Sequence, residues 1–209
     1  MTRTYLRFLS LLSLLLALAC GPKRVETEPS AAVRDTLRPP SAIAYDFMWR
    51  QRVIAHWPTG TQEFEAVLQK RDGVLTLLGL SPMGLPGFVL TLREDRSISV
   101  ENRMGRDLPF EPAYILADVQ RVFFPWLDGA TPEGDGVREG QVGAQHVRER
   151  FVGGHLSMRE FRHAEAADRP IQIDYGSVPE GKDAAEKVTL DNRWHRYKLV
   201  IETFEQDRL

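Results

Sequence analysis

Apolar and polar residues alternate along most of the chain, which is the pattern of strands that bury one face. Between residues 47 and 57 the odd positions include Phe47, Trp49 and Trp57, whereas the even positions include Arg50 and Arg52. Successive side chains of a strand point to opposite faces of a sheet. This segment therefore predicts a long, half-buried strand.

The same alternation predicts further strands, about ten in total. The others lie at residues 62–70, 74–80, 88–92, 98–102, 147–152, 155–161, 171–175, 188–191 and 197–202. Asp72-Gly73 and Gly153-Gly154 are typical of tight hairpins, which join antiparallel strands. Residues 74–80 are apolar at most of their odd and even positions, which predicts a central strand covered on both sides. Residues 127–143 are rich in Gly, Asp and Glu, and we expect a long mobile connection there.

One segment, residues 111–124, changes to the period of a helix. Its apolar residues recur at i, i+1, i+4, i+7 and i+8 and would share one helix face: Ile115, Leu116, Val119, Val122 and Phe123. Pro112 suits the first turn, and Pro125 is a plausible stop. A curled sheet with one apolar face needs a cover, and this helix is the only large cover that the pattern offers. We expect a mainly β (α+β) fold in which an antiparallel sheet wraps around the helix.

The N-terminus follows a different pattern. Arg3 and Arg7 precede an apolar run at residues 8–19, and Cys20, the only cysteine, follows it. This order is typical of a secretory signal peptide, and about 12 apolar residues are too few to span a bilayer. The run Leu16-Ala17-Leu18-Ala19-Cys20 resembles the lipobox of bacterial lipoproteins, which implies cleavage before Cys20 and its acylation. The alternative is an ordinary cleaved signal followed by a chance cysteine, which would leave an unpaired thiol in an oxidising compartment.

Lipidation would anchor the protein, because two or more acyl chains hold a protein stably on a membrane. Gly21 stands where Asp retains enterobacterial lipoproteins in the inner membrane, so this resemblance implies the outer membrane, with the protein facing the periplasm. We divide the chain into a signal peptide (1–19), the lipidated cysteine with a flexible, proline-rich tether (20–42), and one domain (43–209).

Charge and motifs exclude several functions. Cleavage removes Arg3 and Arg7, so 25 Lys and Arg remain against 29 Asp and Glu, a mature charge of about −4 that disfavours nucleic-acid binding. The five histidines lack metal-ligand spacing, and no nucleophile elbow or phosphate loop occurs. We expect a monomer that is not an enzyme, with no metal and no cofactor beyond the lipid on Cys20. Asp118 could be a catalytic acid, but a polar residue that hydrogen-bonds the sheet or a loop is the favoured interpretation.

Three segments carry a family resemblance. The helix segment Ala113-Tyr114-Ile115-Leu116-Ala117-Asp118-Val119-Gln120, continuing to Phe124-Pro125, is the most specific; residues 77–84, and residues 188–192 with 197–203, also fit. Together they resemble domain-of-unknown-function family 3261 over most of residues 47–204. The chain departs from the pattern in the apolar run 121–124 and in a longer, acidic insertion at 127–143.

This resemblance implies a fold and a function. Members of the family are envelope lipoproteins, some in gene neighbourhoods for aryl polyene or related pigments. Their expected fold is similar to LolA and LolB, the periplasmic carrier and the outer-membrane acceptor of lipoproteins. Those proteins are unclosed antiparallel half-barrels with helical lids over an apolar cavity. The resemblance therefore implies an unclosed sheet and a hydrophobic cargo of acyl, lipoprotein or aryl-polyene type.

The residues that would bind such a cargo are apolar side chains of the strands and the helix. They are Phe47, Trp49, Trp57, Phe64, Leu68, Phe88, Leu90, Leu92, Ile115, Leu116, Val119, Val122 and Phe123. The same residues also fit an ordinary core, so two hypotheses remain open.

The first hypothesis is a carrier with a cavity of several hundred Å³ under the helix, whose partners are outer-membrane lipid, a lipidated or polyene cargo and a periplasmic carrier. The second is a non-catalytic envelope assembly or structural partner with a filled core. An enzyme that modifies envelope lipid or glycan would need a cleft with perturbed carboxylates or a metal, and no spacing supports one.

Overall fold

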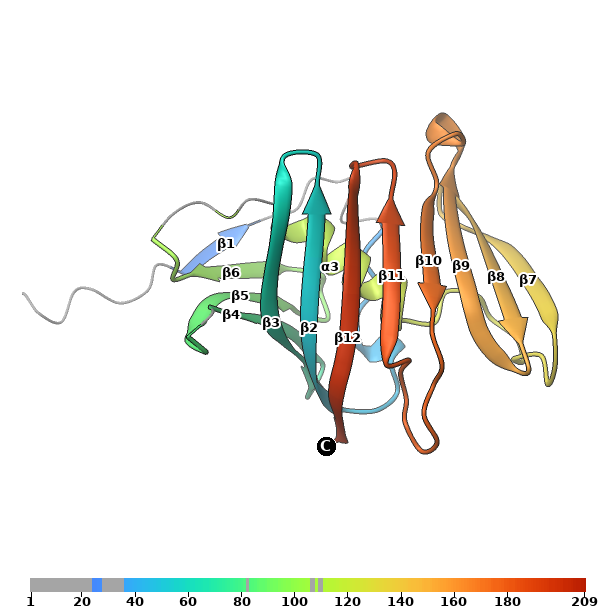
Figure 1. The fold of residues 1–209 in the computed structure, drawn as a ribbon, viewed down its shortest axis with the longest axis horizontal. Helices are drawn as coiled ribbons and strands as arrows, with labels where there is room; N and C mark the ends of the chain where they lie inside the picture. Colours follow the sequence, from blue (N-terminus) through green and yellow to red (C-terminus); the bar gives the residue numbers. More distant parts are fainter. Residues whose placement is uncertain (1–23, 28–35, 82, 106–107, 109–110) are drawn as a thin grey trace, which may run out of the picture.

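The computed structural model describes residues 24–27, 36–81, 83–105, 108 and 111–209. Within these ranges the chain forms one twelve-stranded antiparallel sheet and one α-helix, α3 (Pro112–Phe123), around which the sheet curls (Figure 1). Two single 3₁₀ turns, η2 (Pro40–Ala42) and η3 (Ala164–Ala166), complete the regular structure of this part of the chain. The expected signal peptide and Cys20 lie outside the described residues.

The strands are β1 (Arg24–Thr27), β2 (Phe47–Trp57), β3 (Gly60–Arg71), β4 (Val74–Leu80), β5 (Pro86–Leu92), β6 (Ile98–Asn102), β7 (Gly136–Val142), β8 (Gln145–Val152), β9 (His155–His163), β10 (Ile171–Tyr175), β11 (Lys187–Asn192) and β12 (Tyr197–Arg208). Their order in the sheet is β1-β6-β5-β4-β3-β2-β12-β11-β10-β9-β8-β7. The sheet is therefore unclosed, with β1 and β7 at its edges, as the resemblance implied.

The topology explains the place of the helix. From β2 to β6, and again from β7 to β12, each strand pairs with the next one in the chain, and β2 joins the two halves by pairing with β12. The connection from β6 to β7 must cross the whole width of the sheet. Because α3 lies in this connection, the chain lays the helix across the inner face (Figure 1).

The strongest local signals of the sequence are confirmed. Helix α3 spans residues 112–123, within the predicted 111–124. At the β3–β4 turn Asp72 and Gly73 have φ of 50° and 73°, and at the β8–β9 turn Gly153 and Gly154 have 58° and 80°. Positive φ at both central positions is the geometry of a two-residue hairpin.

The predicted mobile connection at residues 127–143 is wrong, because its second half forms β7 and pairs with β8. The inward positions of β7 alternate, but they carry two glycines and a charge. Arg138 reaches inward and donates to the buried Glu149 at 2.6 Å, and its guanidinium lies 5.3 Å from the Phe151 ring centroid. An ion pair thus replaces the apolar side chains that would have revealed the strand.

The structure differs in part from two other predictions. In β4 the residues Leu75, Leu77 and Gly79 are buried, whereas the alternate positions are only half-buried, so the strand is not fully covered on its outer face. Within the segment expected to be a tether, β1 pairs with β6, and Leu37 is 2% exposed in the core. These parts of residues 20–42 contribute to the folded domain.

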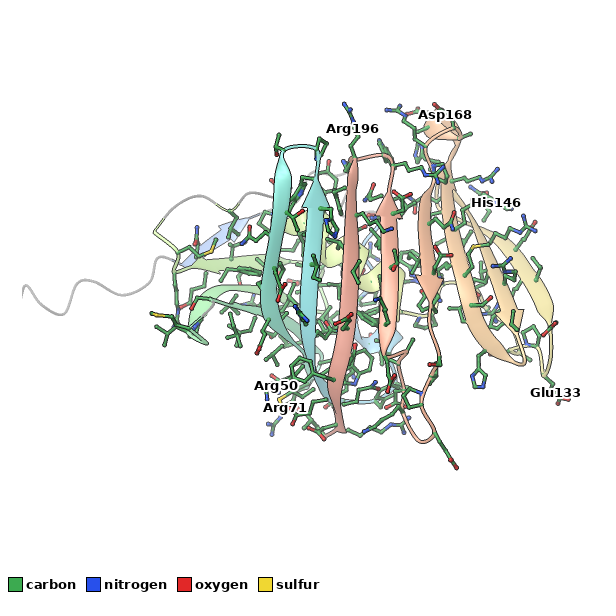
Figure 2. All side chains as sticks on the ribbon, in the orientation of Figure 1. Arg50, Arg71, Glu133, His146, Asp168 and Arg196 are labelled. Atoms are coloured by element: carbon green, nitrogen blue, oxygen red, sulfur yellow. The ribbon has the colours of Figure 1, made fainter. Side chains whose placement is uncertain are left out.

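The outer face of the central strands carries charges. Arg50 lies 3.1 Å from Glu205 and 3.5 Å from Glu65, and Arg52 lies 2.8 Å from Glu63. Figure 2 labels Arg50 on this surface. Exposed pairs of this kind contribute about 0–1 kcal/mol each. Their main consequence is to keep this face in water, so the inner face holds the core.

Gly79 gives a test of how tightly the inner face is packed. A Cβ at Gly79 would lie 2.1 Å from an edge carbon of the Phe88 ring, which is itself 5% exposed. We predict that Gly79→Ala lowers the free energy of unfolding by about 1–3 kcal/mol, because overpacking displaces the ring. Urea unfolding measures this change.

The matched control is Gly60→Ala, where an added Cβ meets nothing within 4 Å and should change stability by less than about 0.5 kcal/mol. Gly79→Ala combined with Phe88→Leu should recover part of the loss. Equal effects of Gly79→Ala and Gly60→Ala would show that the ring has room to move.

Candidate functional site

A small apolar cavity lies between the sheet and α3. Its volume is about 50 Å³. Fifteen side chains line it, and only Gln51 and Asp118 among them are polar; the others are Val53, Ala55, Trp57, Phe64, Ala66, Leu77, Phe88, Ile115, Val119, Val122, Phe123, Leu199 and Ile201. The cavity therefore has the chemistry expected for an apolar ligand.

The thirteen sequence-derived candidates divide into two groups. Seven line the cavity: Trp57, Phe64, Phe88, Ile115, Val119, Val122 and Phe123. The other six are at most 1% exposed and belong to the core: Phe47, Trp49, Leu68, Leu90, Leu92 and Leu116. Two kinds of lining residue were not predicted. Ala55 and Ala66 are small residues on the inward face of strands that supplied candidates, whereas Leu77 and Ile201 lie on β4 and β12, which supplied none.

The cavity is much smaller than the several hundred Å³ that the carrier hypothesis predicts. About 50 Å³ holds one or two water-sized groups, not an acyl chain. Ring packing accounts for part of this closure: Phe64 lies 6.0 Å from Phe88, and Phe123 lies 5.2 Å from Trp49, centroid to centroid. An occupant would have to displace part of the wall.

The wall that faces the sheet is α3, and a buried polar cluster fixes its middle. Asp118 accepts a hydrogen bond from Arg121 at 2.6 Å and from the Asn192 amide at 3.2 Å, and it also accepts from the Tyr197 hydroxyl. Asp118, Arg121 and Asn192 are each at most 4% exposed. Burial and the negative charge of Asp118 raise the pKa of Tyr197, so its hydroxyl remains a donor.

This cluster gives Asp118 a structural role. Its carboxylate is used to hold the helix against β11 and β12, as the favoured interpretation predicted. The family motif of the helix and that of the C-terminal strand pair thus meet in space.

A second set of contacts fixes the C-terminal end of α3. Arg159 donates to the carbonyl oxygens of Arg121 at 2.6 Å and Val122 at 3.3 Å, and the Tyr175 hydroxyl donates to Val122 at 2.8 Å. The last carbonyls of a helix lack intrahelical donors and carry partial negative charge, which a buried arginine satisfies. Glu149, fully buried, accepts from Arg159 at 2.8 Å and balances its charge.

Burial raises the pKa of Tyr175 to about 12, so this phenol stays protonated and keeps donating throughout the physiological range. Sequence reasoning missed Arg159 and Glu149. The sequence did hold one sign of them: each is a charged residue at a position of its strand where the alternation predicts a buried, apolar side chain.

Gln120 ties a third element to the helix. Its side chain accepts from the Arg38 backbone N–H at 2.8 Å and donates to the Arg38 carbonyl at 2.6 Å, so one amide pairs with the backbone as a strand would. The Trp126 indole donates to the Gln120 carbonyl at 2.9 Å. The segment before η2 is thereby held against α3.

The N-terminal half of α3 is held differently. Glu111 provides no side-chain cap, and residues 112–117 make no side-chain hydrogen bond to another described residue. Ala113 and Leu116 are buried, and Tyr114 packs against His195 with ring centroids 4.4 Å apart. The helix thus has one end fixed by buried polar contacts and one end held by apolar and ring contacts.

The described residues contain no group of three or more His, Cys, Asp or Glu side chains placed to hold a metal ion. No helix in the described part of the chain is long and apolar enough to cross a membrane.

The described residues define the class of protein as an open antiparallel half-barrel with a helix over its inner face. Residues 48–205 match the family model described as a protein of unknown function (DUF3261), and the chain belongs to this family. No curated protein matches the chain.

The fold is similar to several solved structures. One is a LolA superfamily protein from Nitrosomonas europaea (11% identity, 84% of this chain and 90% of that chain, TM-score 0.45). Another is a putative outer membrane lipoprotein-sorting protein domain from Vibrio parahaemolyticus (10% identity, 78% and 85%, TM-score 0.45). A third is a DUF1329 family protein from Desulfovibrio piger (12% identity, 87% and 94%, TM-score 0.48).

The buried cluster can be tested by breaking it. We predict that Asp118→Leu lowers the free energy of unfolding by about 3–5 kcal/mol, because Arg121 is left buried without its carboxylate. Asp118→Leu combined with Arg121→Met should recover most of this loss, since neither charge then remains. Urea unfolding of the three proteins measures both effects.

The exposed Asp174 serves as a control, and Asp174→Leu should change stability by at most about 1 kcal/mol. A double variant no more stable than Asp118→Leu alone would show that the pair is not the source of the loss.

Proposed function

We propose that this protein is a non-catalytic envelope lipoprotein that binds the apolar chain of a hydrophobic cargo between the sheet and α3. The observation that carries the proposal is the apolar cavity at this interface, whose helix wall begins at Ile115, in the half that lacks polar anchors, and continues to Phe123. The cargo class is an acyl chain, a lipoprotein or an aryl-polyene-type molecule. Binding needs no chemistry beyond burial, which contributes about 0.8 kcal/mol for each CH₂ removed from water.

The two unlike ends of α3 suggest how the cavity opens. Displacing the Pro112–Leu116 half exchanges apolar protein contacts for apolar ligand contacts, so its net cost is small. Displacing the other half would expose Asp118, Arg121 and the carbonyls that Arg159 holds, which costs several kcal/mol. The protein then has a closed and an open conformation, and the structure is the closed, unliganded one. Cargo that binds the open conformation shifts the equilibrium towards it.

The resemblance of the N-terminus to a lipoprotein signal supports an envelope location for this activity. Acylation of Cys20 would anchor the chain on the outer membrane, facing the periplasm, with no other cofactor. Its partners would be outer-membrane lipid and a periplasmic carrier that delivers the cargo.

The second candidate function is an envelope assembly partner with a filled core. It is favoured by the small cavity volume and by the six candidate residues that are packed in the core. The two functions differ in one measurable property, the uptake of an apolar ligand.

We predict that Val119→Glu reduces uptake of a fluorescent fatty-acid probe at least about tenfold, because it places a charge in the apolar cavity that Val119 lines. Val67→Glu is the control, since Val67 lies on β3 between the inward-facing Ala66 and Leu68 and so points to the outer face. Probe fluorescence and circular dichroism are measured on the full chain. Uptake by neither the parent protein nor the control would favour the filled-core partner.

The loop between β4 and β5 provides a candidate membrane contact. Met83 and Leu85 are 81% and 58% exposed, which is unusual for two large apolar side chains in one loop. We predict that Met83→Ser with Leu85→Ser slows transfer of bound probe to lipid vesicles several-fold and leaves uptake unchanged.

Val137→Ser is the control for transfer, because Val137 is also exposed, at 51%, but lies on β7, an edge strand in the other half of the sheet. Equal transfer rates for the loop variant and this control would exclude the loop as the point of contact.

A further inference from the structure

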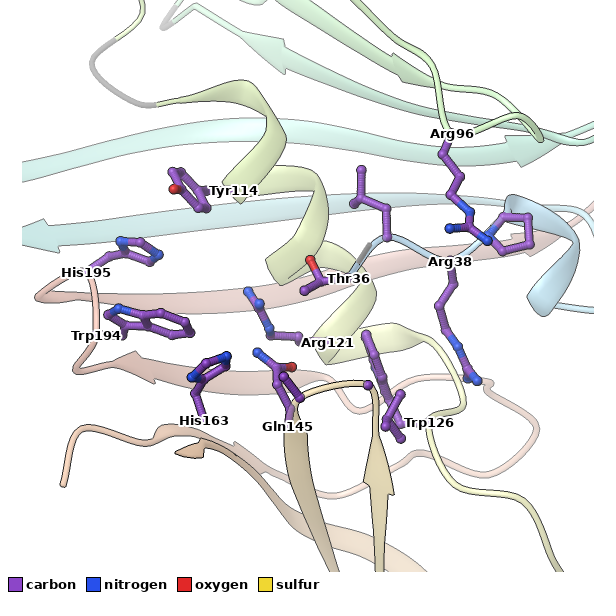
Figure 3. A pocket seen from close by; sticks show the side chains of 15 residues that line it. Thr36, Arg38, Arg96, Tyr114, Arg121, Trp126, Gln145, His163, Trp194 and His195 are labelled. Atoms are coloured by element: carbon purple, nitrogen blue, oxygen red, sulfur yellow. The ribbon is translucent and has the colours of Figure 1, made fainter. Parts of the chain in front are cut away.

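A second and larger cavity, of about 590 Å³, lies on the other flank of α3 (Figure 3). Tyr114 and Arg121 reach it from the helix, whereas the residues that line the apolar cavity lie on the neighbouring helix face. The two cavities share no lining residue, and the Asp118–Arg121 pair stands between them. The volume lies in the range of small-molecule sites.

Positive charge dominates this cavity. Arg38, Arg96 and Arg121 line it, and no Asp or Glu is among its described lining residues. Arg96 makes no ion pair with another described residue. Arg121 pairs with Asp118 through one nitrogen, and its Nε is buried without a hydrogen-bond partner. A guanidinium in partly buried surroundings attracts an oxyanion more strongly than it would in water.

Aromatic rings form the opposite wall. Trp194 stacks on His195 with an interplanar angle of 5° and centroids 5.6 Å apart, and it lies 5.1 Å from His163. Tyr114 continues the row at 4.4 Å from His195. Figure 3 shows these four rings on one side of the cavity, Arg96 and Arg38 on the other, and Arg121 between them.

His195 does not account for the positive charge. Burial lowers the pKa of His195; the carboxylate of Asp118 opposes this shift and Arg121 adds to it. His195 is therefore a neutral ring at pH 7, and the arginines supply the positive charge at every physiological pH.

We propose that this cavity binds an organic anion that carries a carboxylate or phosphate on a planar ring. The ring lies against the wall of Tyr114, His195 and Trp194, and the oxyanion faces the arginines. A guanidinium binds a carboxylate or a phosphate through the same pair of parallel N–H donors. The chemistry that the two ligands share is therefore an anionic group with two acceptor oxygens. This site is independent of the apolar cavity and of the function proposed for it.

The test is calorimetric titration of the full chain in detergent micelles, with empty micelles as the blank. The probes are 2-naphthoate and its neutral amide, 2-naphthamide, which share a ring and differ in charge. We expect naphthoate to saturate one site and the amide to bind at least about tenfold more weakly. Equal affinities would overturn the proposal.

Variants assign the binding to this cavity. Arg96→Gln should weaken naphthoate binding about three- to tenfold without changing amide binding, because it removes a positive charge and leaves the rings in place. The variant should fold, since Arg96 is exposed and its loss leaves no buried partner unpaired. Arg93→Gln, on the same β5–β6 turn but outside the lining, should have no effect. Trp194→Leu, in the β11–β12 turn, should weaken both probes. Unchanged naphthoate binding in Arg96→Gln and Trp194→Leu would place the ligand elsewhere.

Two further probes distinguish a ring-bearing anion from a lipid headgroup. Dodecyl phosphate carries the anionic group without a ring, and 1-naphthyl phosphate carries both; tighter binding of the naphthyl ester supports a ring-bearing ligand. Equal binding would overturn the ring requirement and point to a lipid headgroup. Val119→Glu should retain naphthoate binding, and Arg96→Gln should retain fatty-acid uptake, so a failure at one cavity is distinguishable from a failure at the other.

Discussion

The position of α3 depends on one buried carboxylate, that of Asp118, which joins the helix to the sheet. A carboxylate that is only 2% exposed is tolerated where donors surround it, and Asp118 accepts from Arg121, Asn192 and Tyr197. The sheet offers this set of partners at one place, where β11 meets β12. The hydrogen bonds from Asn192 and Tyr197 therefore fix the helix in register and rotation. The fixed rotation assigns one helix face to the apolar cavity and the next to the arginine-lined one.

The unequal anchoring of the helix has a mechanical consequence. Arg159 and Tyr175 hold its last carbonyls, whereas the first two turns depend on apolar contacts, which have no preferred direction. Local opening follows the weakest contacts, so motion of α3 is expected at Pro112 and not at Phe123. A rigid sheet with one loosely held helix end can admit a chain without losing the arrangement of the rest of the fold.

The sequence predicts the parts of this structure that depend on local rules. Alternation located most strands, Asp72-Gly73 located a hairpin, and the 3.6-residue period located α3. It failed at β7, where the half-buried, inward-facing side chain is Arg138 and pattern rules treat a charge as exposed. It also could not place the partners of Asp118, which lie 74 and 79 residues away in the chain, because no local pattern records which distant donor meets a carboxylate.

The composition of the cavity walls bears on whether the space is a closed binding site or imperfect packing. The sheet contributes small residues under the helix, Ala55 and Ala66, and a glycine, Gly79, over which the Phe88 ring lies at a distance that no side chain would permit. A core selected only for stability gains from filling such space, since each unfilled methyl-sized void costs about 1 kcal/mol. Ala55 and Ala66 instead leave space on the sheet side of the cavity, and the rings of Phe88 and Phe123 line the same space. Aromatic rings turn about only two torsions, so their displacement would enlarge the cavity at little entropic cost. This arrangement favours a site that is closed when empty over a core that is merely incomplete.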